Sequence, residues 1–421
     1  MRVDLIETPE AFEQLEQSWN RVQEADPDAG YFLSWKWLAV VFRANRGRCR
    51  VLAARPEDEP LNYVAFLPLW LDVRWSQSQV EFATKLEAAG RLSWAQYTGF
   101  VCMPDCEEEA LVALAAALRT LPWSHARLTN WLVSGRRRAL FLSTFAADEY
   151  EVSIEDRVRA EGKIDNRVCP FVPLPDSYEE YLSTRVSANT RQKIRRFSRR
   201  VEQSADLQLT PTSPDHFEEH LDALLELWLR KWAPVRGQDS ADRVVRKYRK
   251  ILGQSMECDA VFMPMLWSAG TLLGGLVHIV DRRKGGVHFI VAGRDEAASE
   301  PSIGLVLHAY SIRWAIDNKM RLYDLCHGNE AYKYSLGAID KRIEHLTIRR
   351  RSSVGGGRLD PMNVADGLEE IVKFLDAGRV DDAVSACRQL ATLSRRSTEL
   401  CPSSQAEPDR TSTRSLPEHR S

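Results

Sequence analysis

The sequence predicts a mixed α/β fold in which two domains of similar architecture follow one another. The chain has 421 residues, more than one hydrophobic core usually accommodates. An order of strand, helices, strands, helix and strand over residues 1–160 returns over residues 161–352. Gly355, Gly356 and Gly357 then mark a boundary. These observations favour a duplicated α/β domain followed by a smaller C-terminal segment.

The overall composition excludes several classes of protein. The net charge is −2, from 57 basic and 59 acidic residues, so the whole chain has no marked attraction to DNA or to an acidic membrane. No stretch of about 18 apolar residues predicts a membrane span. The first residues are acidic and do not resemble a signal peptide, so we expect a cytoplasmic protein. The eight cysteines are scattered, and we expect reduced thiols and no metal site.

Hydrophobic periodicity places the elements of the first domain, residues 1–160. Residues 1–7 alternate apolar and polar side chains, which is typical of a strand. Residues 9–23 carry Phe12, Leu15 and Trp19 on one face, which indicates a helix. The further expected elements are a helix over 31–43, strands over 49–54 and 61–72, a helix over 107–121 and a strand over 127–132.

The second domain, residues 161–352, repeats this order with longer elements. We expect a helical region over 177–204, a strand over 207–211, helices over 215–232 and 240–257, strands over 260–268, 271–281 and 286–292, a helix over 302–319, and strands over 321–326 and 345–351.

Two segments follow the second domain. Residues 361–374 and 380–394 indicate a helical hairpin joined at Gly378, within a segment that spans 358–395. This hairpin either packs on the body of the protein or binds a partner. Residues 396–421 hold almost no apolar side chains, so we expect a disordered tail.

The strand–helix–strand unit over residues 286–328 suggests a site for an anionic group. Ser302 suits the N-cap of the predicted helix, and Gly304 allows a backbone to approach a ligand closely. The first N–H groups of a helix have no partner within it and attract phosphate. The alternative is a capped helix in which the glycine serves packing alone.

The strand after this helix ends in a segment dense with polar groups, Tyr323–Tyr334, which reads YDLCHGNEAYKY. Further patterns are FLSWKW at 32–37, FLPL at 66–69, RKW at 230–232 and the turn at 301–305. In order and spacing over residues 1–350 they resemble the GNAT acyltransferase superfamily in its tandem-domain branch. That branch includes the cellulose-biosynthesis-associated acetyltransferases and, more distantly, the FemABX aminoacyltransferases.

The resemblance implies two tandem GNAT-like domains, of which the second binds acyl-CoA. The parallel strands at 287–292 and 321–326 would separate, and the pantetheine arm would pair with the exposed backbone between them. The diphosphate would lie at the start of the helix. The donor-binding residues implied are Val291, Ala292, Ser302, Ile303, Gly304, Leu305 and Val306.

The sequence departs from the family pattern at two places. The usual phosphate turn is Gln/Arg-x-x-Gly-x-Gly/Ala, and here only Gly304 matches. The first domain shows no comparable turn, because residues 102–111 place acids where a phosphate would lie. We therefore expect the first domain to be a degenerate copy that shapes the acceptor cleft.

Acyl transfer to an amine requires a proton acceptor, stabilisation of the carbonyl oxygen and a proton for the thiolate. Tyr332 is the candidate acid for the thiolate, and Tyr334 is a weaker one. Lys333 is placed to meet an oxyanion or a phosphate, or else lies on the surface. Asp324 either orients the amine or is a structural carboxylate, and His327 is either a base or a turn residue. Candidates for acceptor binding are Arg230, Trp232 and Glu330, the last of which is alternatively a helix cap.

A basic cluster over residues 185–200 forms one face of the helix expected there. It is either a solvated surface or a site for an anionic ligand such as the CoA phosphates, an acidic glycan or lipid, or RNA. Its members are Arg185, Arg191, Lys193, Arg195, Arg196, Arg199 and Arg200.

We expect an acyl-CoA-dependent N-acyltransferase that uses acetyl-CoA or another acyl-CoA as co-substrate. The acceptor would be a small-molecule or glycan amine, in cell-envelope or polysaccharide metabolism, and the amine would attack the thioester directly. One alternative is a Fem-type aminoacyltransferase that uses charged tRNA. The other is a non-catalytic interaction module that has kept the fold. Neither the acceptor nor the oligomeric state is indicated by the sequence.

Overall fold

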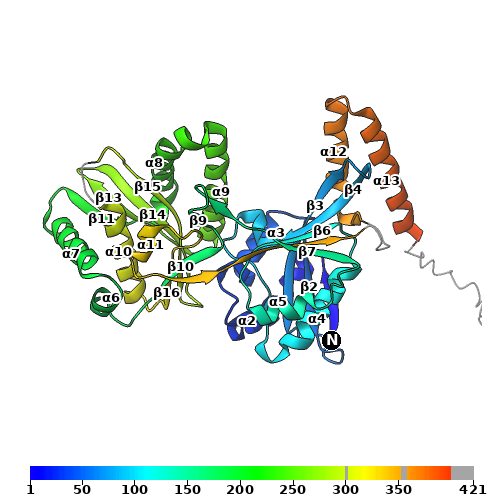
Figure 1. Cartoon of the computed structure of the whole chain (residues 1–421), viewed down its shortest axis with the longest axis horizontal. Helices are drawn as coiled ribbons and strands as arrows, with labels where there is room; N and C mark the ends of the chain where they lie inside the picture. Colours follow the sequence, from blue (N-terminus) through cyan, green and yellow to red (C-terminus); the bar gives the residue numbers. More distant parts are fainter. Residues whose placement is uncertain (299–301, 352–357, 400–421) are drawn as a thin grey trace, which may run out of the picture.

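The computed structural model describes residues 1–298, 302–351 and 358–399. Figure 1 shows two α/β lobes side by side, with a helical hairpin projecting from the first lobe. Each lobe is built on one large mixed sheet. The expected fold class, mixed α/β with two sheets, is therefore confirmed. No helix among the described residues is both long and apolar enough to span a bilayer.

The first sheet has the strand order β1-β2-β3-β4-β6-β18-β7, and only β4 and β6 pair in parallel within that order. Helix α4 (Glu107–Thr120) packs on this sheet. The other helices of the lobe are α1 (Pro9–Glu13), α2 (Glu16–Ala25), α3 (Trp35–Arg43) and α5 (Gly135–Leu142). The strands are β1 (Arg2–Ile6), β2 (Cys49–Arg55), β3 (Ala65–Ser76), β4 (Glu81–Ala88), β5 (Val101–Cys102), β6 (His125–Trp131), β7 (Tyr150–Ile154) and β18 (Glu344–Arg350).

The second sheet has the order β11-β13-β14-β15-β16-β10-β17, in which only β15 and β16 are parallel. Its strands are β10 (Val168–Pro173), β11 (Leu207–Pro211), β12 (Val261–Phe262), β13 (Pro264–Ser268), β14 (Thr271–Asp281), β15 (Gly286–Arg294), β16 (Leu322–Asp324) and β17 (Ile339–Arg342). Its helices are α6 (Tyr178–Thr184), α7 (Ala188–Gln203), α8 (Phe217–Arg236), α9 (Gln238–Glu257), α10 (Ile303–Asp317) and α11 (Ala331–Tyr334). A short ribbon of β8 (Val158–Arg159) and β9 (Ile164–Asp165) lies between the lobes in the sequence.

The last strand corrects the expected order of elements. Residues 345–351 were assigned to the second half, but β18 lies in the first sheet, between β6 and β7. Leu346 and Ile348 join the core of that lobe. Figure 1 shows the chain after β17 crossing from the second lobe into the first. Alternation along a strand identifies the strand but not its neighbours, which are chosen by long-range packing.

Several elements were also missed in the prediction from the sequence, and others were merged. Strands β4, β7 and β10 and helix α5 were not predicted. The helix expected over 9–23 is divided at Gln14 and Leu15, and the helical region over 177–204 is divided before Ser187, whose side chain caps α7.

The two lobes share one apolar core. Phe32, Trp37 and Tyr97 of the first lobe belong to the same cluster of buried side chains as Trp228 and Ile290 of the second. A shared core of this kind holds the lobes in one arrangement, because separating them would expose apolar surface to water. The space between the lobes is therefore a fixed feature of the fold.

The C-terminal hairpin packs on the body of the protein, which was the first of the two alternatives expected for it. Helices α12 (Val364–Asp376) and α13 (Val380–Glu399) cover one end of β3 and β4. The side-chain amide of Gln389 hydrogen-bonds both the N–H and the carbonyl oxygen of Phe82, at 2.7 and 2.8 Å. Helix α13 extends to Glu399, past residue 396 where the tail was expected to begin. The rest of that tail lies outside the described residues.

The hairpin supplies a test of its own packing. Phe374 is 5% exposed, stacks on Phe82 and meets Trp75 edge-on, whereas its neighbour Leu375 is 54% exposed. We expect Phe374→Ala to lower the free energy of unfolding by about 3 kcal/mol or more and Leu375→Ala by about 0.5 kcal/mol or less, as measured by urea denaturation. Equal losses would contradict this packing.

Candidate active site

The two parallel strands of the second sheet separate after a short stretch of pairing. Strand β16 pairs with β15 only from Leu322 to Asp324, opposite Gly286 to His288. Beyond this point the chain of β16 follows β10 instead, since the Leu325 N–H donates to the carbonyl oxygen of Pro170 at 2.9 Å. Strand β15 continues to Arg294, paired with β14 on its other side only. The edge of β15 from residue 289 onward is thus left without a neighbouring strand.

A turn with unusual backbone geometry drives this separation. Cys326 and Gly328 have φ values of +54° and +94°, in the left-handed region. A glycine adopts such values freely, whereas a cysteine there requires support. That support is a hydrogen bond from the Cys326 N–H to Oδ1 of Asp324, at 2.8 Å. The carboxylate at the end of β16 therefore fixes the direction in which the chain leaves the sheet.

A cavity of about 980 Å³ opens where the strands separate. Its walls include the free edge of β15, the start of α10 and the turn after β16, and the first lobe contributes Arg91, Trp94, Gln96 and Asn130. This volume is in the range of sites that enclose a small organic ligand. Both lobes therefore line one site.

The residues implied as donor-binding divide into two groups. Val291, Ala292, Ser302, Gly304 and Leu305 line the cavity. Gly304 faces open space, because a Cβ built on it would meet no atom within 4 Å. The other two, Ile303 and Val306, are 1% and 2% exposed and pack in the core under the helix, away from the cavity.

Ser302 does not cap helix α10 as the sequence predicted. Its φ is +66°, in the left-handed region, and its side chain makes no capping hydrogen bond. The first turn of α10 therefore lacks a side-chain cap at this position, and helix geometry leaves its first N–H groups without partners inside the helix. The preceding Pro301 lies outside the described residues.

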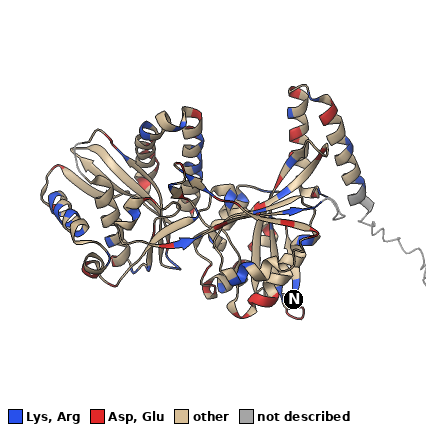
Figure 2. Cartoon of the chain, in the orientation of Figure 1, with Lys and Arg blue, Asp and Glu red and all other residues tan. Residues whose placement is uncertain are grey.

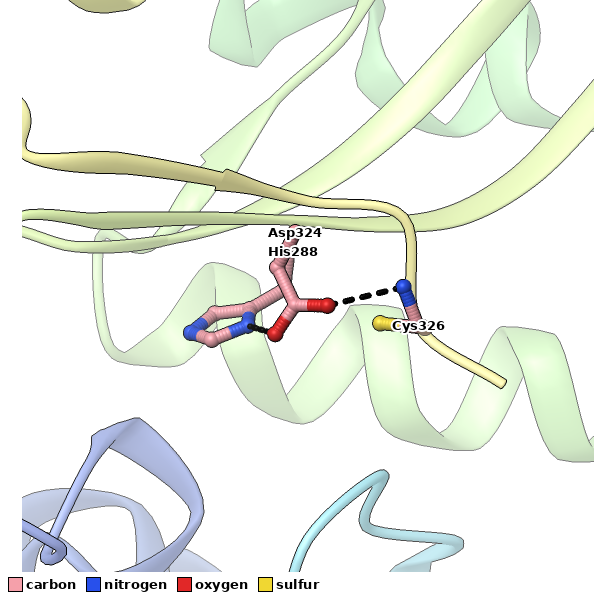
Figure 3. Close-up of side chains that lie close together, drawn as sticks. All are labelled: His288, Asp324 and Cys326. Carbon is pink, nitrogen blue, oxygen red and sulfur yellow. Dashed lines mark hydrogen bonds and ion pairs between the residues drawn. The ribbon is translucent and has the colours of Figure 1, made fainter. Parts of the chain in front are cut away.

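Asp324 is a buried structural carboxylate, which was one of its two expected roles. Figure 3 shows its contacts with His288 Nδ1 and the Cys326 N–H, at 3.1 and 2.8 Å. Tyr97 Oη and Lys341 Nζ add hydrogen bonds of 2.8 and 2.7 Å. Burial alone would raise the pKa of this carboxyl, but the Lys341 ammonium and the His288 hydrogen bond hold it well below its usual range. Asp324 therefore stays ionised and is unsuited to accept a proton.

The same cluster offers three atoms that could bind a metal, on His288, Asp324 and Cys326, all within 4.8 Å of one another. Its chemistry does not fit a divalent cation, however. The two carboxylate oxygens already accept four donors, one of them an ammonium. Burial also raises the pKa of the Cys326 thiol well above its usual value, so the sulfur is not a thiolate.

Lys333 is 3% exposed, and all of its hydrogen-bond donors are used within the turn. Its Nζ lies 3.3, 2.7 and 2.8 Å from the carbonyl oxygens of Cys326, His327 and Gly328, and 3.1 Å from Glu330 Oε2. An ammonium has three N–H donors, so none is left for a substrate. This geometry disfavours the predicted contact with an oxyanion and instead makes Lys333 the residue that holds the turn.

His327 lines the cavity and is wedged between the lobes. Its Nε2 lies 2.8 Å from the carbonyl oxygen of Gln96, and its Nδ1 lies 3.6 Å from Cys169 Sγ. Burial, with the nearby Arg91 charge, lowers the pKa of His327 to about 4. The imidazole is therefore neutral at pH 7, and its contacts are those of a residue that joins the lobes.

Tyr332 has the position expected of an acid that faces the ligand. It lines the cavity and is 46% exposed, and no hydrogen bond from its hydroxyl is found among the described residues. Desolvation, together with the Glu330 charge, raises the pKa of Tyr332 and keeps the hydroxyl protonated. Tyr334 instead donates its hydroxyl proton to Asp340, at 2.9 Å, and is absent from the lining.

The acceptor-binding candidates are only partly brought together. Trp232 and Glu330 line the cavity, and Glu330 also pairs with Arg159 and Lys333. Arg230 is exposed, forms an ion pair with Glu226 at 2.6 Å and lies outside the lining. The basic cluster follows α7, where Figure 2 shows blue segments of the ribbon grouped, and no α7 residue lines the cavity.

A buried chain of hydrogen bonds, which the sequence did not reveal, ends at the cavity. Tyr323 Oη lies 2.8 Å from His278 Nε2 and 2.7 Å from His308 Nδ1, and His278 Nδ1 lies 3.3 Å from the carbonyl oxygen of Phe262. That carbonyl can only accept, so His278 carries its proton on Nδ1 and Tyr323 donates to Nε2. His308 must then donate from Nδ1, which leaves its Nε2 as an acceptor. A histidine on a helix face gives no sequence signal of such a chain.

The comparisons with known proteins follow the same part of the chain. Residues 188–334 match the model of the acetyltransferase (GNAT) domain family, which supports acyl transfer as the general chemistry of this fold. The crystal structure of FemX superposes with a TM-score of 0.57 at 10% identity, covering 83% of this chain and 98% of that chain. This likeness concerns the fold.

Two further solved structures give lower TM-scores. A tandem GNAT protein from the clavulanic acid biosynthesis pathway gives a TM-score of 0.46 at 10% identity, covering 84% of this chain and 100% of that chain. L-PGS from Bacillus licheniformis gives 0.44 at 13% identity, covering 83% and 94%. A search of curated protein sequences found no match.

The lowered pKa values of four histidines predict that the protein is less stable in acid. Burial lowers the pKa of His278 and His308 to about 3, and that of His327 and His345 to about 4. The unfolded chain takes up protons near pH 6.5, whereas the folded chain takes them up only at lower pH. The free energy of unfolding should therefore fall from pH 6.5 to pH 4, by up to about 1.4 kcal/mol per pH unit for each histidine. Urea denaturation at several pH values measures this slope, which His327→Asn should reduce. A slope unchanged in that variant would contradict the assignment.

Proposed function

We propose that this chain is an acyl-CoA-dependent N-acyltransferase, with acetyl-CoA as the expected donor and an amine as the acceptor. The observation that carries the proposal is the free edge of β15, which faces a cavity next to the start of α10. Backbone N–H and C=O groups in such a place need partners. The amide groups of a pantetheine arm can pair with them as an added strand would.

The start of α10 suits the diphosphate of the same donor. Gly304 leaves room for it, and the first amides of the helix supply N–H donors and a partial positive charge. Only this glycine of the usual phosphate turn is present, so backbone amides carry most of the binding. Val291 and Ala292 then place the arm along β15, and the thioester comes to lie near the turn after β16.

Tyr332 is proposed as the proton donor in the transfer step. The amine nitrogen attacks the thioester carbon, the carbon–sulfur bond breaks, and the leaving sulfur takes the proton of the Tyr332 hydroxyl. The Tyr332 oxygen then regains a proton from the nitrogen of the new amide, which restores both groups. His308 is proposed to accept a hydrogen bond from the N–H of the acceptor amine at its free Nε2. Its ring lines the cavity, and the centroid of that ring lies 5.9 Å from that of Tyr332. Lys333 is a positioning residue, since it holds in place the turn that precedes Tyr332 in the chain.

The acceptor is proposed to enter between the lobes, where Trp94 and Gln96 of the first lobe and Trp232 of the second line the cavity. A Fem-type transfer from charged tRNA remains the alternative, and the likeness to FemX in fold keeps it as an arm of the test. A role in cell-envelope or polysaccharide metabolism, and a cytoplasmic location, belong to the same proposal.

Calorimetric titration with acetyl-CoA tests the donor site. We expect Gly304→Leu to weaken binding by about tenfold or more, because the side chain fills the space proposed for the diphosphate. Leucine is also a better helix former than glycine, so the thermal midpoint should be kept or raised.

Gly253→Leu is the matched control, since Gly253 lies in α9 with open space at its Cβ and outside the cavity. It should bind acetyl-CoA as the unaltered protein does. Unchanged affinity in Gly304→Leu would refute the diphosphate position. Binding of aminoacyl-tRNA but of no acyl-CoA would favour the Fem-type alternative, and binding of neither would favour an interaction module.

Tyr332→Phe tests the proton donor. Release of the CoA thiol, followed with an amine that supports turnover, should slow by about 100-fold while the affinity for acyl-CoA is unchanged. Tyr334→Phe is the control and should retain activity, because Tyr334 points to Asp340. Similar rates in both variants would remove Tyr332 from the mechanism.

A further inference from the structure

A second, smaller pocket of about 300 Å³ adjoins the main cavity. The two share Arg91, Trp94, Asn130, Arg157 and His345 as lining residues, so they are continuous. The start of α10 and the free edge of β15 line only the larger one. The small pocket therefore lies on the side of the cavity away from the proposed donor.

Positive charge dominates the walls of this pocket. Five basic residues line it against a single carboxylate, that of Glu87. Lys85 pairs with Glu87, and Arg127 lies 3.8 Å from it. The five basic residues are Arg91, Arg127, Arg157, Lys247 and Lys250. Glu155 lies next to the pocket and is likewise shared, at 2.8 Å from Arg157 and 3.4 Å from Arg127. The acids present are thus too few to neutralise the bases.

Arg91 shows this excess most clearly. Among the described residues its guanidinium donates to the carbonyl oxygen of Ala95 and forms no ion pair. Burial lowers the pKa of Arg91 to about 10; the charge of Glu87 opposes this shift, and the charges of Arg157 and Arg127 add to it. Like charges held together at a partly buried position cost free energy, which a bound anion would recover.

His345 contributes an unused donor to the same pocket. It is 5% exposed, and its Nδ1 accepts the backbone N–H of Asn130 at 3.3 Å. Burial and the charges of Arg157 and Arg91 lower the pKa of His345 to about 4, so the ring is neutral and its proton is on Nε2. That Nε2 is buried and has no hydrogen-bond partner among the described residues. A buried N–H without a partner is costly and indicates a missing acceptor.

We propose that this pocket binds an oxyanion, a phosphate or carboxylate group that the amine acceptor carries, through Arg91, Arg157 and His345. Arginines offer planar pairs of N–H donors that match either group, and the His345 Nε2–H adds a directed third contact. The anion would anchor the acceptor on the first lobe, with its amine reaching the main cavity. Assigning the anion to the acceptor rests on the proposed transferase function, whereas the anion site itself does not.

Calorimetric titration with inorganic phosphate, at constant ionic strength, tests the anion site directly. We expect Arg91→Gln to weaken phosphate binding by about tenfold or more, since a hydrogen bond to a charged group is lost. The same variant should have an unchanged or higher thermal midpoint without phosphate, because repulsion in the empty pocket is relieved. A parallel titration with acetate identifies which oxyanion is preferred.

Arg246→Gln is the matched control. Arg246 is exposed on α9, the helix that carries Lys247 and Lys250, but lies outside the pocket lining. The Arg246→Gln variant removes one positive charge, as Arg91→Gln does, and should leave the affinity for phosphate unchanged. Failure of both phosphate and acetate to bind, or equal losses in the two variants, would overturn the proposal.

Competition with acetyl-CoA separates this proposal from the donor assignment. We expect phosphate to bind equally well in the presence of saturating acetyl-CoA, because the two occupy different ends of the cavity. Displacement of phosphate by acetyl-CoA would assign the pocket to the donor and overturn the acceptor part. If no acyl-CoA binds while phosphate does, the transferase proposal fails and the anion site stands.

Discussion

The arrangement of the site depends on one buried carboxylate, that of Asp324. Four donors from separate segments meet on it, and Figure 3 shows two of them. The Tyr97 hydroxyl comes from the first lobe and the Lys341 ammonium from β17, so the same group ties the lobes together and ends β16. Removing one partner leaves a buried charge uncompensated. The loss of free energy is then far larger than the stabilisation that the intact pair provides. This constraint explains why such polar residues occupy the end of a core strand.

The separation of the strands follows from that carboxylate. Since Asp324 holds the Cys326 N–H, the chain turns toward β10 and leaves the backbone of β15 without a neighbour. An unpaired strand edge normally invites aggregation, but here the lobes and α10 enclose it. Lys333 secures the turn by binding three of its carbonyl oxygens, which accounts for a buried lysine without assigning it chemistry.

The sequence predicted those features that periodicity and glycine chemistry determine. Strand β14 and helix α4 were placed to within a residue. Gly304 was singled out because it allows a backbone to approach a ligand closely, and the structure leaves open space at its Cβ. Strand β10 was missed because Pro170 and Pro173 argue against a central strand. The sheet to which β18 belongs, and the contact of Asp324 with Tyr97, depend on residues more than two hundred positions apart, which local patterns do not encode.

The return of β18 to the first sheet has a consequence for the wall of the small basic pocket. It carries His345 from the end of the second half onto the wall that Asn130 of β6 provides, so neither half alone completes that wall. The first domain was expected to be a degenerate copy that shapes the acceptor cleft. Its arginines and the crossing strand make the wall of the small pocket predominantly basic. The acceptor proposed to bind there would have to bring negative charge, because burying cations without a counterion is unfavourable. Under the proposed function, selectivity for the acceptor is therefore separated in space from binding of the donor.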